Sequence, residues 1–166
     1  MNKKTKYITS AAMIAALYVV LTYLSSLFGL SSGAIQVRLS EALCVMPYFT
    51  SAAIPGLFVG CLLANLLTGG CVLDLIFGSI ATLLGAVIAR YLRKHEFLIP
   101  IPTILANALI VPLVLIYGYG IIMPYLYLFL TVGAGEVISC LVFGLLLLKV
   151  LKRIPYLQEV KRSEEE

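Results

Sequence analysis

Leu98–Tyr117 reads LIPIPTILANALIVPLVLIY, and these twenty residues contain no charged side chain. A helix needs about 20 mainly apolar residues to cross the hydrocarbon core of a bilayer. The rest of the chain has the same character, since 61% of its 166 residues are hydrophobic, 12% are charged and the mean hydropathy is +1.05. Soluble domains carry about 25% charged residues. The sequence therefore predicts an all-α membrane protein.

Glycine, proline and charged residues divide the chain into six apolar segments. We expect one integral membrane domain over 1–166, a compact bundle of six transmembrane helices at about 7–29, 38–50, 52–68, 73–91, 98–117 and 123–150, with a charged tail at 159–166. The first segment is longer than the apolar core of a signal peptide, which has about 7–15 residues, so it is expected to be retained. The six spans leave no room for a separate soluble domain.

Basic residues predict the orientation of these spans. They cluster near the N-terminus, around 90–94 and around 149–162. With the N-terminus in the cytoplasm, six crossings place eleven of the twelve Lys and Arg residues on the cytoplasmic side. The positive-inside rule favours this arrangement. We therefore expect both termini in the cytoplasm, and no nucleic-acid partner, because the basic residues flank the spans.

Polar side chains within these spans are the candidate site. An ionisable group at membrane depth costs about 2.5–3.5 kcal/mol on insertion scales, so each needs a partner or a function. The candidate substrate-binding residues are the charged Arg38, Glu41, Asp74 and Glu136 and the amides Gln36, Asn65 and Asn107. In the six-span arrangement most of this set lies in the outer half of the bundle. We interpret it as a pocket that opens to the outside.

These residues also have structural explanations, which the sequence leaves open. Arg38 and Glu41 are three positions apart and can form an ion pair on one helix face. Asp74 can cap a helix that begins after Gly69-Gly70, and Glu136 can bond to a neighbouring helix. If Arg38 pairs with Glu41, the other two acids lack a cation, which suits a ligand rich in N–H donors. One carboxylate can accept two parallel N–H bonds from the edge of a guanine-like base.

The loop expected between the last two spans is rich in tyrosine. Tyr117, Tyr119, Tyr125 and Tyr127 all lie there. An aromatic belt at the membrane interface is one explanation. Stacking on a flat heterocyclic ligand is the other, and Tyr117 is the candidate for it.

Four alanines on the first span form a small-residue surface. Ala11 and Ala15 are four apart, as are Ala12 and Ala16. Small residues at this spacing let two helices approach closely within lipid. The surface can serve packing inside the bundle or docking of a partner membrane subunit.

Motifs for catalysis, cofactors and metals do not lead to an enzyme. The chain lacks the nucleotide-binding patterns G-x-x-x-x-G-K-[ST] and G-x-G-x-x-G, and its four cysteines include no C-x-x-C pair. Gly29–Gly33 matches the hydrolase pattern G-x-S-x-G, but the one histidine, His95, is expected on the opposite membrane face. We expect no catalytic, metal or cofactor site. ATP-driven transport would therefore need ATPase subunits from other chains.

Several of these segments resemble the QueT family. The resemblance lies in IQVRLSEAL at 35–43, Pro47, Ala53–Gly56, Asn65-Leu66, Gly69-Gly70, Asp74 and Phe77–Ser79. QueT proteins are regarded as substrate-binding (S) components of energy-coupling factor (ECF) transporters. The resemblance implies a six-helix S component in the bacterial plasma membrane that takes up a 7-deazaguanine precursor of queuosine from outside.

The resemblance also implies partners and roles. An S component associates with a transmembrane coupling protein, for which the alanine surface is a candidate, and with two ATPases. Residues 31–36 would form a gate over the site. Our own hypothesis from the residues is that Glu41, Asp74 and Glu136 accept the ligand's N–H edge or amine, that Gln36, Asn65 and Asn107 read its other polar positions, and that Arg38 orients Glu41 or contacts a carbonyl. The alternatives are an S component for another vitamin or heterocycle and a secondary transporter driven by protons through Glu136.

Overall fold

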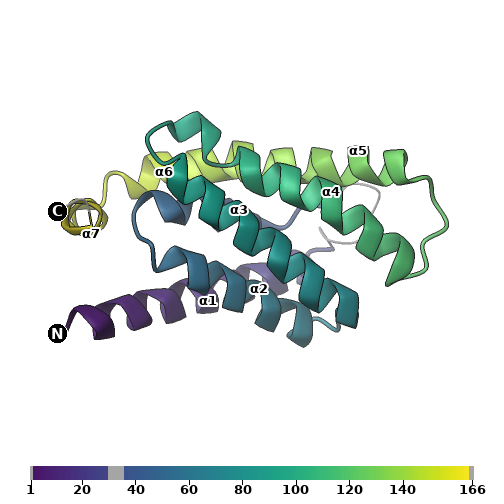
Figure 1. Cartoon of the computed structure of the whole chain (residues 1–166), viewed down its shortest axis with the longest axis horizontal. Coiled ribbons are helices and arrows are strands. Elements are labelled where there is room, and N and C mark those ends of the chain that lie inside the picture. Colours follow the sequence, from purple (N-terminus) through teal and green to yellow (C-terminus); the bar gives the residue numbers. More distant parts are fainter. Residues whose placement is uncertain (1, 30–35, 165–166) are drawn as a thin grey trace.

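The computed structural model describes residues 2–29 and 36–164, and over these ranges the chain is helical and contains no strand (Figure 1). The all-α prediction is therefore confirmed for this part of the chain. The elements are α1 (Lys3–Leu27), η1 (Leu39–Tyr48), α2 (Ala53–Leu67), η2 (Asp74–Gly78), α3 (Ser79–Tyr91), η3 (Glu96–Leu98), α4 (Ile101–Tyr117), α5 (Tyr125–Glu136), η4 (Val137–Phe143), α6 (Gly144–Leu151) and α7 (Pro155–Ser163).

Within the described part of the chain, four helical stretches are long and apolar enough to cross a membrane, namely Lys3–Leu27, Asp74–Tyr91, Glu96–Tyr117 and Tyr125–Leu151. Helix α2 is apolar but shorter. Large apolar side chains are exposed along the outside of these helices, including Ile8, Leu126 and Leu146. Soluble proteins rarely expose such continuous apolar surface, and helices that face lipid do.

The second expected span, 38–50, is the short helix η1 at the centre of the bundle. It is a 3₁₀ helix whose residues from Ser40 to Tyr48 are all buried, and it packs against α1, α3, α6 and η4. A 3₁₀ helix rises about 2.0 Å per residue, so these ten residues extend about 20 Å. The hydrocarbon core is about 30 Å thick. Helix η1 is thus a short helix buried at the centre of the bundle, and it is shorter than the four candidate membrane spans.

Helices α1 and α2 approach each other closely because glycines line one of them. A Cβ atom added to Gly56 would lie 2.8 Å from the Ala11 carbonyl oxygen, and one added to Gly60 would lie 3.0 Å from the Ala15 Cα. Ala15 is buried accordingly, whereas Ala12 and Ala16 are exposed. The alanine surface expected from the sequence is therefore divided, with one pair packed inside the bundle and the other pair facing outward.

Both chain ends lie at the same end of the bundle (Figure 1). There helix α7, which includes the first part of the expected charged tail, is held by Glu164. The Glu164 carboxylate accepts hydrogen bonds from the Thr50 hydroxyl at 2.6 Å, the Ser51 N–H at 2.9 Å and the Arg90 guanidinium at 2.5 Å. We call Glu164 and these three partners the α7 clasp. It connects α7 to the start of α2 and the end of α3.

Two expectations lie largely outside the described residues. Of the gate expected at 31–36, only Gln36 is described, and the G-x-S-x-G match at 29–33 extends beyond Gly29 into the undescribed part.

Candidate functional site

The three buried acids that the sequence singled out lie in or next to irregular helices. Glu41 lies in the 3₁₀ helix η1, Asp74 is the first residue of the π-helix η2, and Glu136 directly precedes the π-helix η4. Single π-helical turns inside α-helices are rare, and many of those that are known lie at functional sites. These three departures from α-helical geometry each lie at or next to a buried acid, whereas the 3₁₀ helix η3 contains no buried residue.

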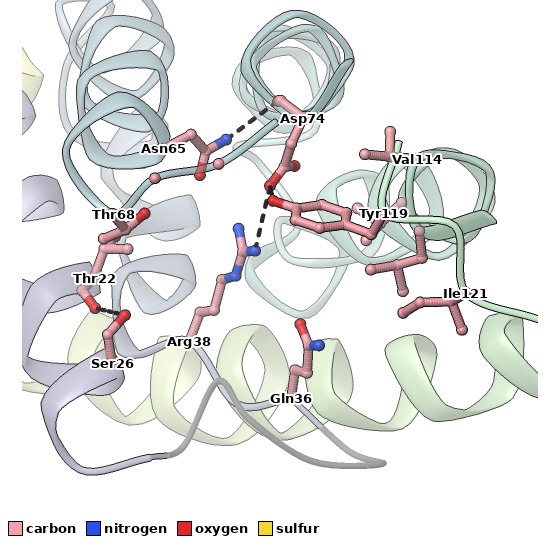
Figure 2. Close-up of a pocket in the computed structure, with 14 residues that line it drawn as sticks. Thr22, Ser26, Gln36, Arg38, Asn65, Thr68, Asp74, Val114, Tyr119 and Ile121 are labelled. Carbon is pink, nitrogen blue, oxygen red and sulfur yellow. Dashed lines mark hydrogen bonds and ion pairs between the residues drawn. The ribbon is translucent and has the colours of Figure 1, made fainter. Parts of the chain in front are cut away.

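A cavity of about 300 Å³ is lined by the end of α1, the segment before η1, the end of α2, Asp74 of η2, and the end of α4 with the loop that follows it. The ends of α1, α2 and α4 lie at the end of the bundle opposite the two termini (Figure 1). Its polar lining consists of Thr22, Ser26, Gln36, Arg38, Asn65, Thr68, Asp74 and Tyr119 (Figure 2). Apolar residues at the end of α4 complete the wall. We call Arg38, Asn65, Asp74 and Tyr119 the upper layer.

Asp74 is the centre of the upper layer. Its Oδ2 atom accepts a hydrogen bond from the Tyr119 hydroxyl at 3.0 Å and lies 3.9 Å from Arg38 Nη2. The Asn65 amide donates to the main-chain oxygen of Asp74 at 3.2 Å. The sequence suggested that Arg38 pairs with Glu41 and that Asp74 lacks a cation. Arg38 instead has extended backbone before η1, and its side chain reaches Asp74.

Tyr119 lies in the loop after α4 and faces the cavity. Its hydroxyl oxygen also accepts a hydrogen bond from the Cys71 N–H at 3.2 Å. Burial and the adjacent Asp74 carboxylate raise the pKa of Tyr119 to about 12. The phenol is therefore protonated at neutral pH and donates its hydrogen to Asp74.

A second polar cluster is buried deeper in the bundle; it consists of Tyr18, Glu41, Asn107, Glu136 and Cys140, and we call it the lower layer. The Tyr18 hydroxyl donates to Glu41 Oε1, and the Asn107 amide donates to Glu41 Oε2 at 3.5 Å. The Cys140 thiol lies 3.3 Å from Glu136 Oε2 and 3.4 Å from the Glu41 carbonyl oxygen, and its one hydrogen serves either acceptor. Glu41 is 3% and Glu136 8% exposed.

Helix geometry places the lower layer beneath the cavity. Tyr18 precedes Thr22 by four residues on α1, and Asn107 precedes Val111 by four residues on α4. Residues four apart on an α-helix lie on the same face, one turn above the other. Thr22 and Val111 line the cavity, so the lower layer lies about one helical turn below its lining.

The segment that carries Gln36 and Arg38 is held against the join between α5 and η4. The Arg38 N–H donates to the Ser139 hydroxyl at 3.2 Å. Gly135 lies so close to the Gln36 main chain that any Cβ atom at this position would overlap the Gln36 carbonyl oxygen. A glycine is therefore required at 135 for this segment to line the cavity.

The structure divides the eight expected substrate-binding residues into three groups. Gln36, Arg38, Asn65 and Asp74 line the cavity, and Glu41, Asn107 and Glu136 belong to the lower layer. Tyr117 is 76% exposed and is not part of the lining, where Tyr119 lies instead. The one sequence signal that favours Tyr119 is its position between Gly118 and Gly120, which allows the tight loop.

The lower layer also has the geometry of a possible metal site, although the sequence gave no reason to expect one. Ligand atoms of Glu41, Glu136 and Cys140 all lie within 4.8 Å of one another. Carboxylates and a thiolate together suit Zn²⁺. Metal binding would require the Cys140 thiol to lose its hydrogen, which it donates to either the Glu41 carbonyl oxygen or the Glu136 carboxylate.

Long apolar helices around a buried polar cavity are characteristic of a multi-pass membrane protein that binds a small polar solute. Comparison with known families agrees: the chain belongs to the QueT transporter family, whose model matches residues 8–153. It is 39% identical over 82 residues to a protein of Lactococcus lactis subsp. cremoris (strain MG1363) named Queuosine precursor transporter QueT. That alignment covers 49% of this chain and 48% of the relative, so about half of each protein is compared. No solved structure matches this chain.

Proposed function

We propose that this protein is the substrate-binding subunit of an ECF importer and captures a 7-deazaguanine precursor of queuosine from outside the cell. The observation that carries the proposal is the cavity in which Arg38, Asn65 and Asp74 meet inside an otherwise apolar bundle. Membership of the QueT transporter family and the name of the Lactococcus relative support this choice of substrate.

Recognition would use both polar layers. The Asp74 carboxylate accepts a hydrogen bond from the N–H edge of the base, and the charge of the carboxylate strengthens that bond. Asn65 and Gln36 read the neighbouring polar positions of the base, and Arg38 contacts a carbonyl. A substituent of the base that extends into the lower layer would form hydrogen bonds with Glu41, Glu136 and Asn107. Exclusion of water from such a cavity strengthens each of these bonds.

The proposed orientation has six crossings and both termini in the cytoplasm. Its support is the shared position of the two chain ends together with the placement of the basic residues. The cavity lies at the opposite end and would then open to the outside. An importer subunit needs this geometry to meet its substrate.

The proposal includes a coupling subunit that docks on α1. Ala12 and Ala16 are the exposed half of the alanine surface, and Ala11 and Ala15 are already used against α2. Small exposed residues let a partner helix approach closely within lipid. The chain carries no phosphate-binding loop, so the energy would come from the ATPases bound to that partner.

Mass spectrometry of the small molecule that co-purifies with the protein tests the proposal directly. A 7-deazaguanine derivative should be found, and purified protein should bind the labelled base. Glu41→Gln and Glu136→Gln should each weaken that binding by about 5- to 150-fold, the effect of removing one buried acceptor. Co-purification of another heterocycle, which displaces the deazaguanine in competition, would assign a different substrate to the same fold.

A proton-coupled secondary transporter is the second candidate function. The observation in its favour is the close approach of the Glu41 and Glu136 carboxylates in the lower layer, within 4.8 Å. Two like charges this close repel each other, so one of the two acids is able to carry a proton. Uptake by vesicles that contain this chain alone, abolished by a proton uncoupler, would support it. Uptake that requires ATP and ATPase subunits would support the importer.

A further inference from the structure

Two donors approach the same oxygen of Asp74. The Tyr119 hydroxyl is at hydrogen-bond distance from Oδ2, at 3.0 Å, and Arg38 Nη2 is at 3.9 Å from it. Figure 2 shows the two side chains directed at the carboxylate from different elements. Arg38 comes from the segment before η1, and Tyr119 comes from the loop after α4.

The other oxygen of Asp74 faces the backbone. A Cβ atom built on Gly78 would lie 2.8 Å from Asp74 Oδ1. Oδ1 is therefore directed at the following turn of its own helical segment, and Oδ2 is the atom presented to the other lining residues. A ligand N–H that seeks this carboxylate must use Oδ2. A carboxylate oxygen offers about two lone-pair directions, so the ligand competes with the groups already there.

Tyr119 is the partner that can leave at small cost. Its side chain is 45% exposed, so water can solvate the hydroxyl when the bond to Asp74 breaks. Its second bond, from the Cys71 N–H, is also near the surface. Arg38 is more buried and is fixed through its main chain to Ser139. The departure of Arg38 would leave a charge in the bundle, whereas the departure of Tyr119 leaves a neutral phenol at the surface.

We infer that the Tyr119 hydroxyl is an exchangeable latch on Asp74: it occupies the acceptor of the empty cavity and gives way to an N–H donor of the ligand. The inference rests on the proposed function, in which Asp74 accepts a hydrogen bond from the base. The latch keeps the buried carboxylate bonded while the cavity is empty. It also lowers the affinity for any ligand, since each must replace an existing hydrogen bond. Tyr119 is thus a residue that sets affinity.

Tyr119→Phe tests the latch, with 7-deazaguanine as the probe and equilibrium binding as the measurement. Removal of the hydroxyl removes the competitor, so the probe should bind about 2- to 10-fold more tightly, the net contribution of one typical hydrogen bond whose donor is partly exposed to water. The matched control is Tyr117→Phe, because Tyr117 lies two positions away, is 76% exposed and does not line the cavity. It should bind as the wild type does.

Weaker or unchanged binding by Tyr119→Phe would overturn the latch. Weaker binding would mean that the hydroxyl holds the ligand. In an Asp74→Asn background the hydroxyl competes for a poorer acceptor, so Tyr119→Phe should then have little effect. A full effect in that background would also contradict the latch.

A ligand-independent readout separates the latch from the proposed function. Protein labelled with 3-fluorotyrosine gives a fluorine resonance for Tyr119 that is assigned by its loss in Tyr119→Phe. Asp74→Asn should shift this resonance and leave that of Tyr117 in place. An unmoved Tyr119 resonance would refute the latch, whereas failure of the wild type to bind 7-deazaguanine would refute the proposed substrate alone.

Discussion

The two ends of the bundle hold their charges differently. In the α7 clasp, Glu164 accepts three hydrogen bonds of 2.5–2.9 Å from Arg90, Thr50 and Ser51. At the cavity end, the Arg38–Asp74 pair is 3.9 Å long. Charge-assisted hydrogen bonds normally measure about 2.7–2.9 Å. The clasp is therefore fully closed, whereas the upper layer holds opposite charges just beyond hydrogen-bond distance.

This difference indicates what each cluster does. A carboxylate whose acceptors are occupied by short bonds stabilises the fold and has little left to offer a ligand. A buried carboxylate that is bonded to an exposed phenol, with its guanidinium partner 3.9 Å away, can exchange the phenol for a donor of the ligand. Burial alone therefore does not identify the site. The lengths of the contacts around each acid separate the structural cluster from the one that suits a ligand.

The largest effect that we expect comes from Gly135→Ala. The added methyl group would overlap the Gln36 carbonyl oxygen and displace the segment that carries Gln36 and Arg38. Binding of 7-deazaguanine should fall by about 100-fold or more, since displacement of a binding segment by about 1 Å has effects of this size. The control is Gly133→Ala, whose Cβ atom would lie 3.7 Å from that of Ala108, an ordinary contact. Equal binding by both variants would contradict the role of position 135.

Glu164→Gln should reduce stability and leave the cavity unaffected. The change removes the charge that pairs with Arg90 and weakens the bonds to Thr50 and Ser51. Loss of a charged hydrogen-bonding group costs about 1–3 kcal/mol, so the melting temperature in detergent should fall by several degrees. Glu159→Gln, at an exposed position of α7, is the control. A change in ligand affinity with no change in melting temperature would reverse the assignment of the two clusters.

The smallest effect should come from Lys152→Met. Lys152 bonds to Glu96 at 2.6 Å, but both side chains are more than a third exposed. Such surface pairs contribute about 0.2–1 kcal/mol, and salt screens them. The melting temperature should fall by at most a few degrees at low salt and by less at high salt. A large fall in melting temperature that does not depend on salt would mean that this pair stabilises the fold as strongly as the α7 clasp does.

The same pair predicts a pH dependence. The hydrogen bond to Glu96 raises the pKa of Lys152. The folded state therefore favours the protonated amine, and the contribution is complete below the pKa of the unfolded chain, about 10.4. It is lost as the pH rises through the higher pKa of the folded state. The difference in melting temperature between wild type and Lys152→Met should accordingly vanish at high pH, and a difference that grows there would contradict the pairing.

The sequence predicted the helices because apolar composition and helix length are local properties. It also identified the buried acids Glu41, Asp74 and Glu136, since a charge in an apolar segment is conspicuous. It did not predict that they divide into two layers. That division depends on the 3₁₀ helix η1 and the π-helices η2 and η4. Their geometry follows from tertiary packing, and no periodic pattern in the sequence marks it.

Two details of the site show the same limit. Spacing of three residues made Arg38 and Glu41 a plausible ion pair, but Arg38 precedes the helix in extended backbone, so the spacing rule does not apply to it. Tyr117 and Tyr119 are equivalent by composition, and the path of the loop decides which one faces Asp74. Contacts between residues distant in sequence, such as Tyr119 with Asp74, require the fold.

The measurement that tests the central claim most directly is the affinity of the purified wild-type protein and of Asp74→Asn for 7-deazaguanine. Asp74 is the acid at the centre of the cavity, where the exposed Tyr119 hydroxyl bonds to it and Arg38 lies 3.9 Å away. We predict that the wild type binds the base and that Asp74→Asn binds it about 5- to 150-fold more weakly. Equal affinity of the two proteins would contradict the assignment of this cavity as the substrate site.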